Sequence, residues 1–91
     1  MSFKLLEKEV DELNAFYCKD TKNHLVIRNY LGNYQVCLTG KTSHVGLKDR
    51  YFGITNGFSD PYTACQNLKV CNKYGWLRSV IVRYEKRTWI N

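Results

Sequence analysis

The sequence predicts an α+β fold in which an antiparallel sheet is packed by two helices, in the order α-β-β-β-α-β. Three observations favour it: an apolar stripe with helical spacing near the start, two strand-like segments joined at a glycine, and a later helix that begins at a proline. The chain has 91 residues, which suffices for a modest core. We therefore expect one domain over residues 1–91, without repeats or linkers.

The first helix is expected near the start of the chain. Ser2 can cap its first turn, and apolar side chains follow at steps of three and four residues. This stripe consists of Phe3, Leu6, Val10, Leu13 and Tyr17. The opposite face is acidic, with Glu7, Glu9, Asp11 and Glu12. Such a face is either simply solvated or a contact surface.

Two strands are expected at residues 24–31 and 33–39, with a tight hairpin turn at Gly32-Asn33. In the second strand, apolar and polar residues alternate with a period of two, which is typical of a sheet with one solvated face. The apolar positions are Tyr34, Val36 and Leu38. Residues 40–49 form the loop that follows.

A third strand is expected at residues 50–55, which are rich in aromatic and β-branched side chains. Asn56-Gly57 can form a tight turn. Asp60 and Pro61 then mark the start of a helix, and Gly75 suits its left-handed C-terminal cap. The buried stripe of this helix is expected to contain Ala64, Leu68 and Cys71, with Cys65 beside it.

The last strand is expected at residues 79–84. Val80, Ile81 and Val82 form an uninterrupted apolar run, which is typical of a strand covered on both faces. A short additional strand is expected at residues 88–90.

Charge is distributed unevenly along the chain. The formal net charge is +6, yet residues 1–20 hold three basic and five acidic side chains, which leaves eleven basic and three acidic ones in residues 21–91. A positive field favours polyanions such as nucleic acid, an anionic membrane surface or an acidic protein. The alternative is that the charge only aids solubility.

The cysteines do not form a metal-binding pattern. Cys18, Cys37, Cys65 and Cys71 contain no CxxC pair, and neither His24 nor His44 lies near two of them at zinc-finger spacing. We expect no metal and no cofactor, and cysteines that pack as small hydrophobes. No apolar run follows Met1, so we expect no secretory signal or membrane span, no membrane partner and a cytoplasmic protein without disulfides.

Two groups of basic and aromatic residues are the candidate nucleic-acid-binding site. The first lies in and after the loop and contains Lys41, Lys48, Arg50 and Tyr51. The second lies near the end and contains Arg78, Arg83, Lys86, Arg87 and Trp89. The cations can hold phosphate while the rings stack on bases. Gly40-Lys41-Thr42 is not a P-loop, because Gln35 stands where the motif needs its first glycine.

These observations favour a small protein that binds nucleic acid, RNA or single strands in particular, without catalysis. One alternative is an inhibitor or antitoxin-like factor with a protein partner. Another is a metal-independent ribonuclease with His24 or His44 as its base. The sequence leaves the partner and the oligomeric state open.

Three resemblances accompany this interpretation. The α-β-β-β-α order resembles a double-stranded-RNA-binding domain, although Pro61-Tyr62-Thr63-Ala64 lacks the lysine cluster that this family carries there. Residues 57–82 resemble part of a sporulation-related peptidoglycan-binding repeat, through Gly57-Phe58-Ser59-Asp60, Ala64, Leu68, Gly75-Trp76, Val80 and Val82. In size and charge the chain is similar to small bacteriophage accessory proteins, which implies a host protein or nucleic acid as partner.

Overall fold

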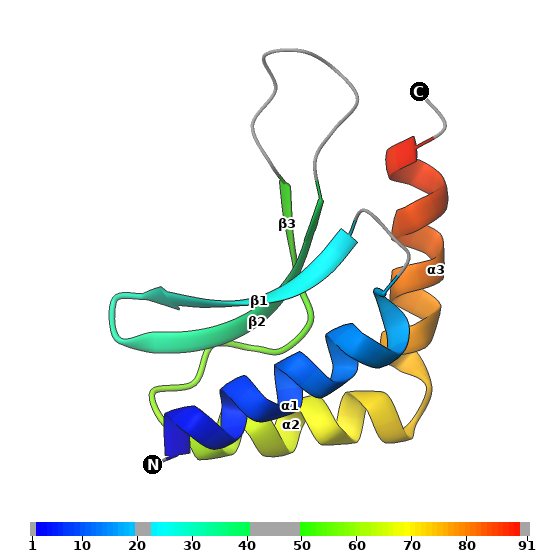
Figure 1. The fold of residues 1–91 in the computed structure, drawn as a ribbon. Helices are drawn as coiled ribbons and strands as arrows, with labels where there is room; N and C mark the ends of the chain where they lie inside the picture. Colours follow the sequence, from blue (N-terminus) through cyan, green and yellow to red (C-terminus); the bar gives the residue numbers. More distant parts are fainter. Residues whose placement is uncertain (1, 20–22, 41–49, 90–91) are drawn as a thin grey trace.

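The computed structural model describes residues 2–19, 23–40 and 50–89, and within them every side chain except those of residues 50 and 84–89 (Figure 1). The elements are α1 (Ser2–Tyr17), β1 (Asn23–Tyr30), β2 (Asn33–Gly40), β3 (Arg50–Gly53), α2 (Pro61–Lys73) and α3 (Trp76–Trp89). The three strands form one antiparallel sheet in the order β1-β2-β3. The predicted α+β class is therefore confirmed.

The β1-β2 hairpin turns at Leu31 and Gly32, one residue earlier than predicted. Both have positive φ, 53° and 82°, as a type I′ turn requires. The pairing that follows sets Leu25 opposite Leu38 and Ile27 opposite Val36. Because side chains alternate along a strand, these four apolar residues share one face of the sheet.

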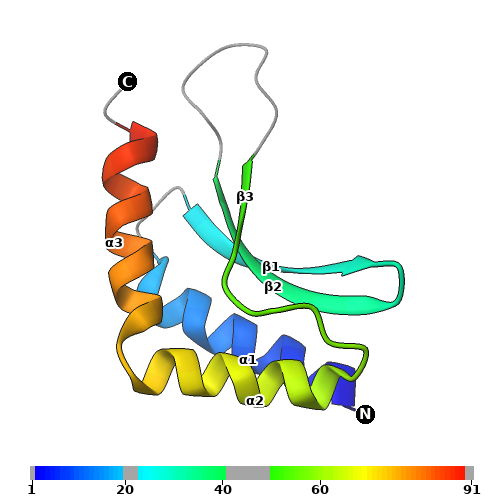
Figure 2. The same cartoon turned by 180° about the vertical axis from the view of Figure 1, so that it is seen from behind.

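A bulge ends β3. The backbone N–H groups of Ile54 and Thr55 both donate to the carbonyl of Val36, at 2.8 and 3.2 Å. Two consecutive residues of this segment therefore lie opposite a single residue of β2, as in a β-bulge. The chain then pairs again with β2, where Phe58 bridges Tyr34. The Asn56-Gly57 turn was a wrong prediction: neither residue has positive φ, because this segment stays extended beside β2 and leads to α2 (Figure 2).

The helices α1 and α2 run side by side in the same direction beneath one face of the sheet (Figures 1 and 2). The Cys65 thiol lies 3.9 Å from the Leu5 carbonyl near their starts. Near their ends, the Tyr17 hydroxyl donates to the Asn72 side chain at 2.7 Å. Buried side chains of both predicted stripes meet the apolar sheet face in the core: Leu6, Val10, Leu13, Ala64, Cys65 and Leu68 against Leu25, Val36 and Leu38. Two stripe residues differ from the prediction, because Phe3 is 38% exposed and Cys71 is only partly buried.

Both predicted ends of α2 are confirmed. At the start, the Asp60 carboxylate accepts from the backbone N–H of Tyr62 at 3.2 Å and from the Thr63 hydroxyl at 3.0 Å. At the end, Gly75 has a φ of 76°, which permits the reversal out of the helix.

The predicted strand at residues 79–84 is wrong, and so is a strand beginning at Thr88. Residues 76–89 form the helix α3, which begins after Gly75 and stands beside the sheet (Figure 1). Leu77, Val80 and Ile81 are buried at helical spacing, whereas Val82 is 48% exposed. The observed order is therefore α-β-β-β-α-α. A short apolar run is compatible with either a strand or a helix. The buried positions of this segment recur at three- and four-residue steps, which is the spacing of a helix.

The side chain of Asn14 in α1 forms hydrogen bonds with the backbone of the edge strand β1. The Asn14 amide donates to the carbonyl of Leu25 at 2.9 Å and accepts from its backbone N–H at 2.6 Å. In this way Asn14 supplies the hydrogen bonds that a further strand would give to β1.

The assignment of α3 can be tested with Val80→Thr and Val82→Thr, which keep the β-branched shape and nearly the same helix propensity. Burying a hydroxyl at position 80 should lower the free energy of unfolding by about 1–3 kcal/mol. The exposed position 82 should change by about 0.5 kcal/mol or less. Urea denaturation measures both. In a strand the two positions would share a face, so equal losses would contradict the helix.

The link between α1 and β1 can be tested with Asn14→Ala. This change leaves both backbone groups of Leu25 without their partner, so the free energy of unfolding should fall by about 2 kcal/mol. The control is Asp11→Ala, at an exposed position of the same helix, which should change by about 0.5 kcal/mol or less. Equal losses in urea denaturation would show that Asn14 does not hold the sheet edge.

Candidate nucleic-acid interface

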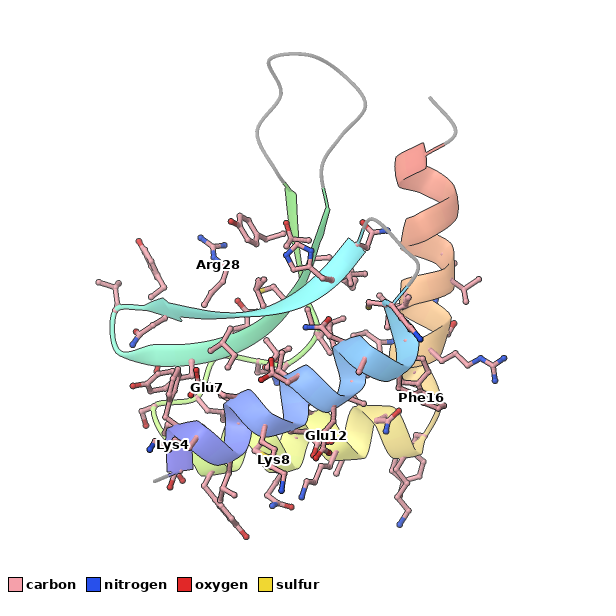
Figure 3. The ribbon with its side chains drawn as sticks, in the orientation of Figure 1. Lys4, Glu7, Lys8, Glu12, Phe16 and Arg28 are labelled. Carbon is pink, nitrogen blue, oxygen red and sulfur yellow. The ribbon has the colours of Figure 1, made fainter. Side chains whose placement is uncertain are left out.

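The side of the sheet turned away from α1 and α2, here called the open face, carries polar, basic and aromatic side chains. The strand register assigns to it His24, Val26, Arg28 and Tyr30 of β1, Asn33, Gln35, Cys37 and Thr39 of β2, and Tyr51 and Gly53 of β3. Figure 3 shows Arg28 on the opposite side of the sheet from Lys4, Glu7, Lys8 and Glu12. The acidic residues Glu7 and Glu12 of α1 thus lie away from the open face.

Arg28 crosses the open face to reach Tyr51. Its guanidinium carbon lies 4.1 Å from the centroid of the Tyr51 ring, within the range of a cation–π interaction. Arg28 is paired with Gln35 in the register, while Tyr51 is paired with Thr39, so the side chain passes diagonally over Cys37. Tyr51 remains 49% exposed. A positive charge and an aromatic ring are therefore presented together to solvent.

Cys37 lies under this crossing and is buried. Burial raises the pKa of its thiol, and the charge of Arg28 opposes this rise only in part. Burial likewise raises the pKa values of the Cys65 and Cys71 thiols. These three thiols stay protonated at neutral pH. Cys37 and Cys65 are buried, as predicted from the sequence, whereas Cys71 is only partly buried. None of the four cysteines, all of which lie in the described residues, forms a disulfide.

The amide of Gln35 is held in one orientation. Its Nε2 donates to the Thr55 carbonyl at 2.9 Å, which the bulge after β3 presents to it. Gly53 leaves the necessary room, because a Cβ at that position would lie 2.6 Å from the Gln35 Nε2. The Thr55 carbonyl thus orients the Gln35 amide and engages one of its two N–H groups.

An open pocket of about 440 Å³ lies at the hairpin end of this face. It is lined by Arg28, Tyr30, Asn33, Gln35 and Gly57. Tyr30 is 71% exposed, so most of its ring surface is accessible. The lining combines a cation, an aromatic ring and two amides, and the volume falls in the range of pockets that hold small molecules.

The predicted site residues with described side chains lie in two places. Tyr51 is on the open face, whereas Arg78 and Arg83 are exposed on α3. Arg83 donates to the Ser79 hydroxyl one turn earlier, at 3.3 Å. In the part of the chain that the structure describes, no hydrogen bond or ring contact joins Tyr51 to either arginine.

The remaining predicted site residues are described in part or lie outside the described residues. Arg50 belongs to β3 by its backbone, and Lys86, Arg87 and Trp89 belong to α3. Lys41 and Lys48, together with His44, lie outside the described residues. His24 is exposed on β1. Within residues 2–19, 23–40 and 50–89, no group of three or more His, Cys, Asp or Glu side chains could hold a metal ion, and no described helix is both long and apolar enough to cross a membrane.

Four residues of the open face were not predicted as site residues from the sequence: Arg28, Tyr30, Asn33 and Gln35. Alternation could have found them, because every second residue from His24 to Tyr30 must share a face once Leu25 and Ile27 are assigned to the core. The approach of Arg28 to Tyr51 could not be found in this way, since it depends on the register of two hairpins.

No protein-family model, curated protein or solved structure matches this chain. The resemblance to a sporulation-related repeat fails at Val80 and Val82, which lie in a helix and not in a strand. The first five elements keep the α-β-β-β-α order on which the resemblance to a double-stranded-RNA-binding domain depends. A shared layout alone carries no function.

Proposed function

We propose that this protein binds single-stranded nucleic acid, RNA in preference to DNA, through the open face of its sheet, and that it does so in the cytoplasm and without catalysis. The observation that carries the proposal is the Arg28–Tyr51 pair, with its 4.1 Å approach, beside the exposed ring of Tyr30. Aromatic rings stack on bases, and a guanidinium adds electrostatic attraction to phosphate or to the base.

Single strands fit this face better than a duplex. In a duplex the flat faces of the bases are stacked on one another, so exposed rings on a sheet cannot reach them. A single strand can splay its bases onto Tyr30 and Tyr51. The side-chain amide of Asn33 and the side-chain oxygen Oε1 of Gln35 can also form hydrogen bonds with a ribose 2′-hydroxyl, a group that DNA lacks.

The basic helix α3 can add contacts to phosphate. Arg78 and Arg83 are exposed on it, and neither has an ion pair with a described carboxylate. With a formal net charge of +6 the whole chain attracts polyanions, which increases the rate of encounter.

A second candidate function is binding to a protein, as an inhibitor or antitoxin-like factor does. Phe16 and Tyr74 are each 76% exposed near the ends of α1 and α2, the end that Tyr17 and Asn72 join. Exposed aromatic residues are enriched in protein interfaces. A protein recovered with the wild type after nuclease treatment, and lost with Phe16→Ala plus Tyr74→Ala, would support this function.

Stacking can be tested with Tyr51→Ala, with Tyr62→Ala as a matched control. Both tyrosines are 49% exposed, but Tyr62 lies on α2 and not on the open face. Fluorescence anisotropy with a labelled single-stranded RNA should show that Tyr51→Ala weakens binding by about 1–3 kcal/mol, whereas Tyr62→Ala binds as the wild type does. Equal affinities for the two variants would contradict a role of the open face.

The electrostatic contribution can be tested with Arg28→Gln and Lys8→Gln. Each lowers the net charge by one, but only Arg28 lies on the open face (Figure 3). If Arg28 neutralises a phosphate, the slope of log affinity against log salt should become shallower by about 0.7 in Arg28→Gln only. The same change in Lys8→Gln would mean that binding follows net charge alone. RNA affinity independent of salt in the wild type would refute the proposal.

A further inference from the structure

We infer that the pocket at the hairpin end of the open face takes a guanine base of the bound strand, an inference that rests on the proposed single-strand binding. The pocket is lined by Arg28, Tyr30, Asn33, Gln35 and Gly57, and its volume of about 440 Å³ leaves room for a purine. The hydrogen-bonding atoms that these side chains leave available favour guanine.

Arg28 offers only donors. Its guanidinium is held over the Tyr51 ring, and it makes no hydrogen bond to another described residue. The N–H groups around the edge of the guanidinium are therefore available. Two parallel N–H groups of an arginine match the neighbouring O6 and N7 acceptors of guanine, the commonest base-specific contact of this side chain.

Gln35 offers an acceptor. One N–H of its Nε2 donates to the Thr55 carbonyl at 2.9 Å, which orients the amide and leaves Oε1 and the second N–H for a ligand. Guanine carries donors, N1–H and the N2 amino group, on the edge next to O6, and these can meet such an acceptor.

The strand register places these two groups side by side. Arg28 and Gln35 are directly paired across β1 and β2, so their side chains leave neighbouring positions of the same face. Tyr30 follows Arg28 on that face, and its exposed ring can stack on the base. Asn33 is paired with Tyr30 and can accept from the second donor of guanine.

Cytosine is the nearest competitor. Its O2 and N3 also form a pair of acceptors beside a donor, the N4 amino group. It has one donor group on that edge where guanine has two, so its contacts with Gln35 and Asn33 would both have to come from that amino group. Its single ring also covers less of Tyr30. Adenine would set its N6 amino group against the N–H groups of Arg28, and uracil has no neighbouring pair of acceptors.

The test uses four fluorescently labelled RNA heptamers of adenosine that differ only in the central base. Anisotropy titrations should show the guanine heptamer binding about tenfold more tightly than the adenine heptamer, with cytosine in between. In Arg28→Lys, which keeps the charge but loses the paired N–H groups, this ratio should fall to about twofold or less. Lys8→Arg, on the opposite side of the sheet (Figure 3), should keep the ratio.

The possible results separate the two proposals. Equal, salt-sensitive binding of all four heptamers would overturn guanine selection and leave single-strand binding intact. A preference for adenine, cytosine or uracil, or a guanine preference that persists in Arg28→Lys, would likewise overturn it. Absence of binding to every heptamer would overturn both proposals.

Discussion

The structure depends on the burial of a single face of its three-stranded sheet beneath two parallel helices. Leu25, Val36 and Leu38 pack against the apolar stripes of α1 and α2, and Asn14 holds the β1 edge in place. Because side chains alternate along a strand, this burial also determines which residues face the other way. The position of Arg28 and Tyr51 on the open face is therefore a consequence of how the core is packed.

Local rules predicted the first five elements. Helical spacing gave α1, period-two alternation gave β2, and the Asp60 cap, Pro61 and Gly75 gave both ends of α2. The α3 helix departs from the prediction, because the uninterrupted apolar run of Val80, Ile81 and Val82 indicates a strand. Spacing that starts at Leu77 explains the burial, since Leu77, Val80 and Ile81 are buried while Val82 is not. A local run could not show that a second helix follows Gly75.

The candidate site could be predicted only in part. An aromatic ring near basic residues in the sequence favours Tyr51 as a site residue, and Tyr51 lies on the open face beside a cation. The cation was not one of those expected, since Arg28 comes from a strand more than twenty residues away in the sequence. Contacts of this kind depend on strand register and on the bulge at Ile54 and Thr55, which composition and spacing do not encode.

The distribution of charge suggests how such a surface could bind. Described cations lie on several elements: Lys4 and Lys8 on α1, Lys69 and Lys73 on α2, Arg78 and Arg83 on α3, and Arg28 on the sheet. Of these, Arg28 is the one that the strand register assigns to the open face. A cation–π contact at an exposed site contributes about 0.5–1 kcal/mol. The contact between Arg28 and Tyr51 therefore stabilises the fold only a little, and its main effect is to orient the guanidinium. If the open face binds a single strand as proposed, the strand would meet two exposed tyrosines and one described cation there, an arrangement that suits stacking and base-edge contacts better than phosphate contacts alone.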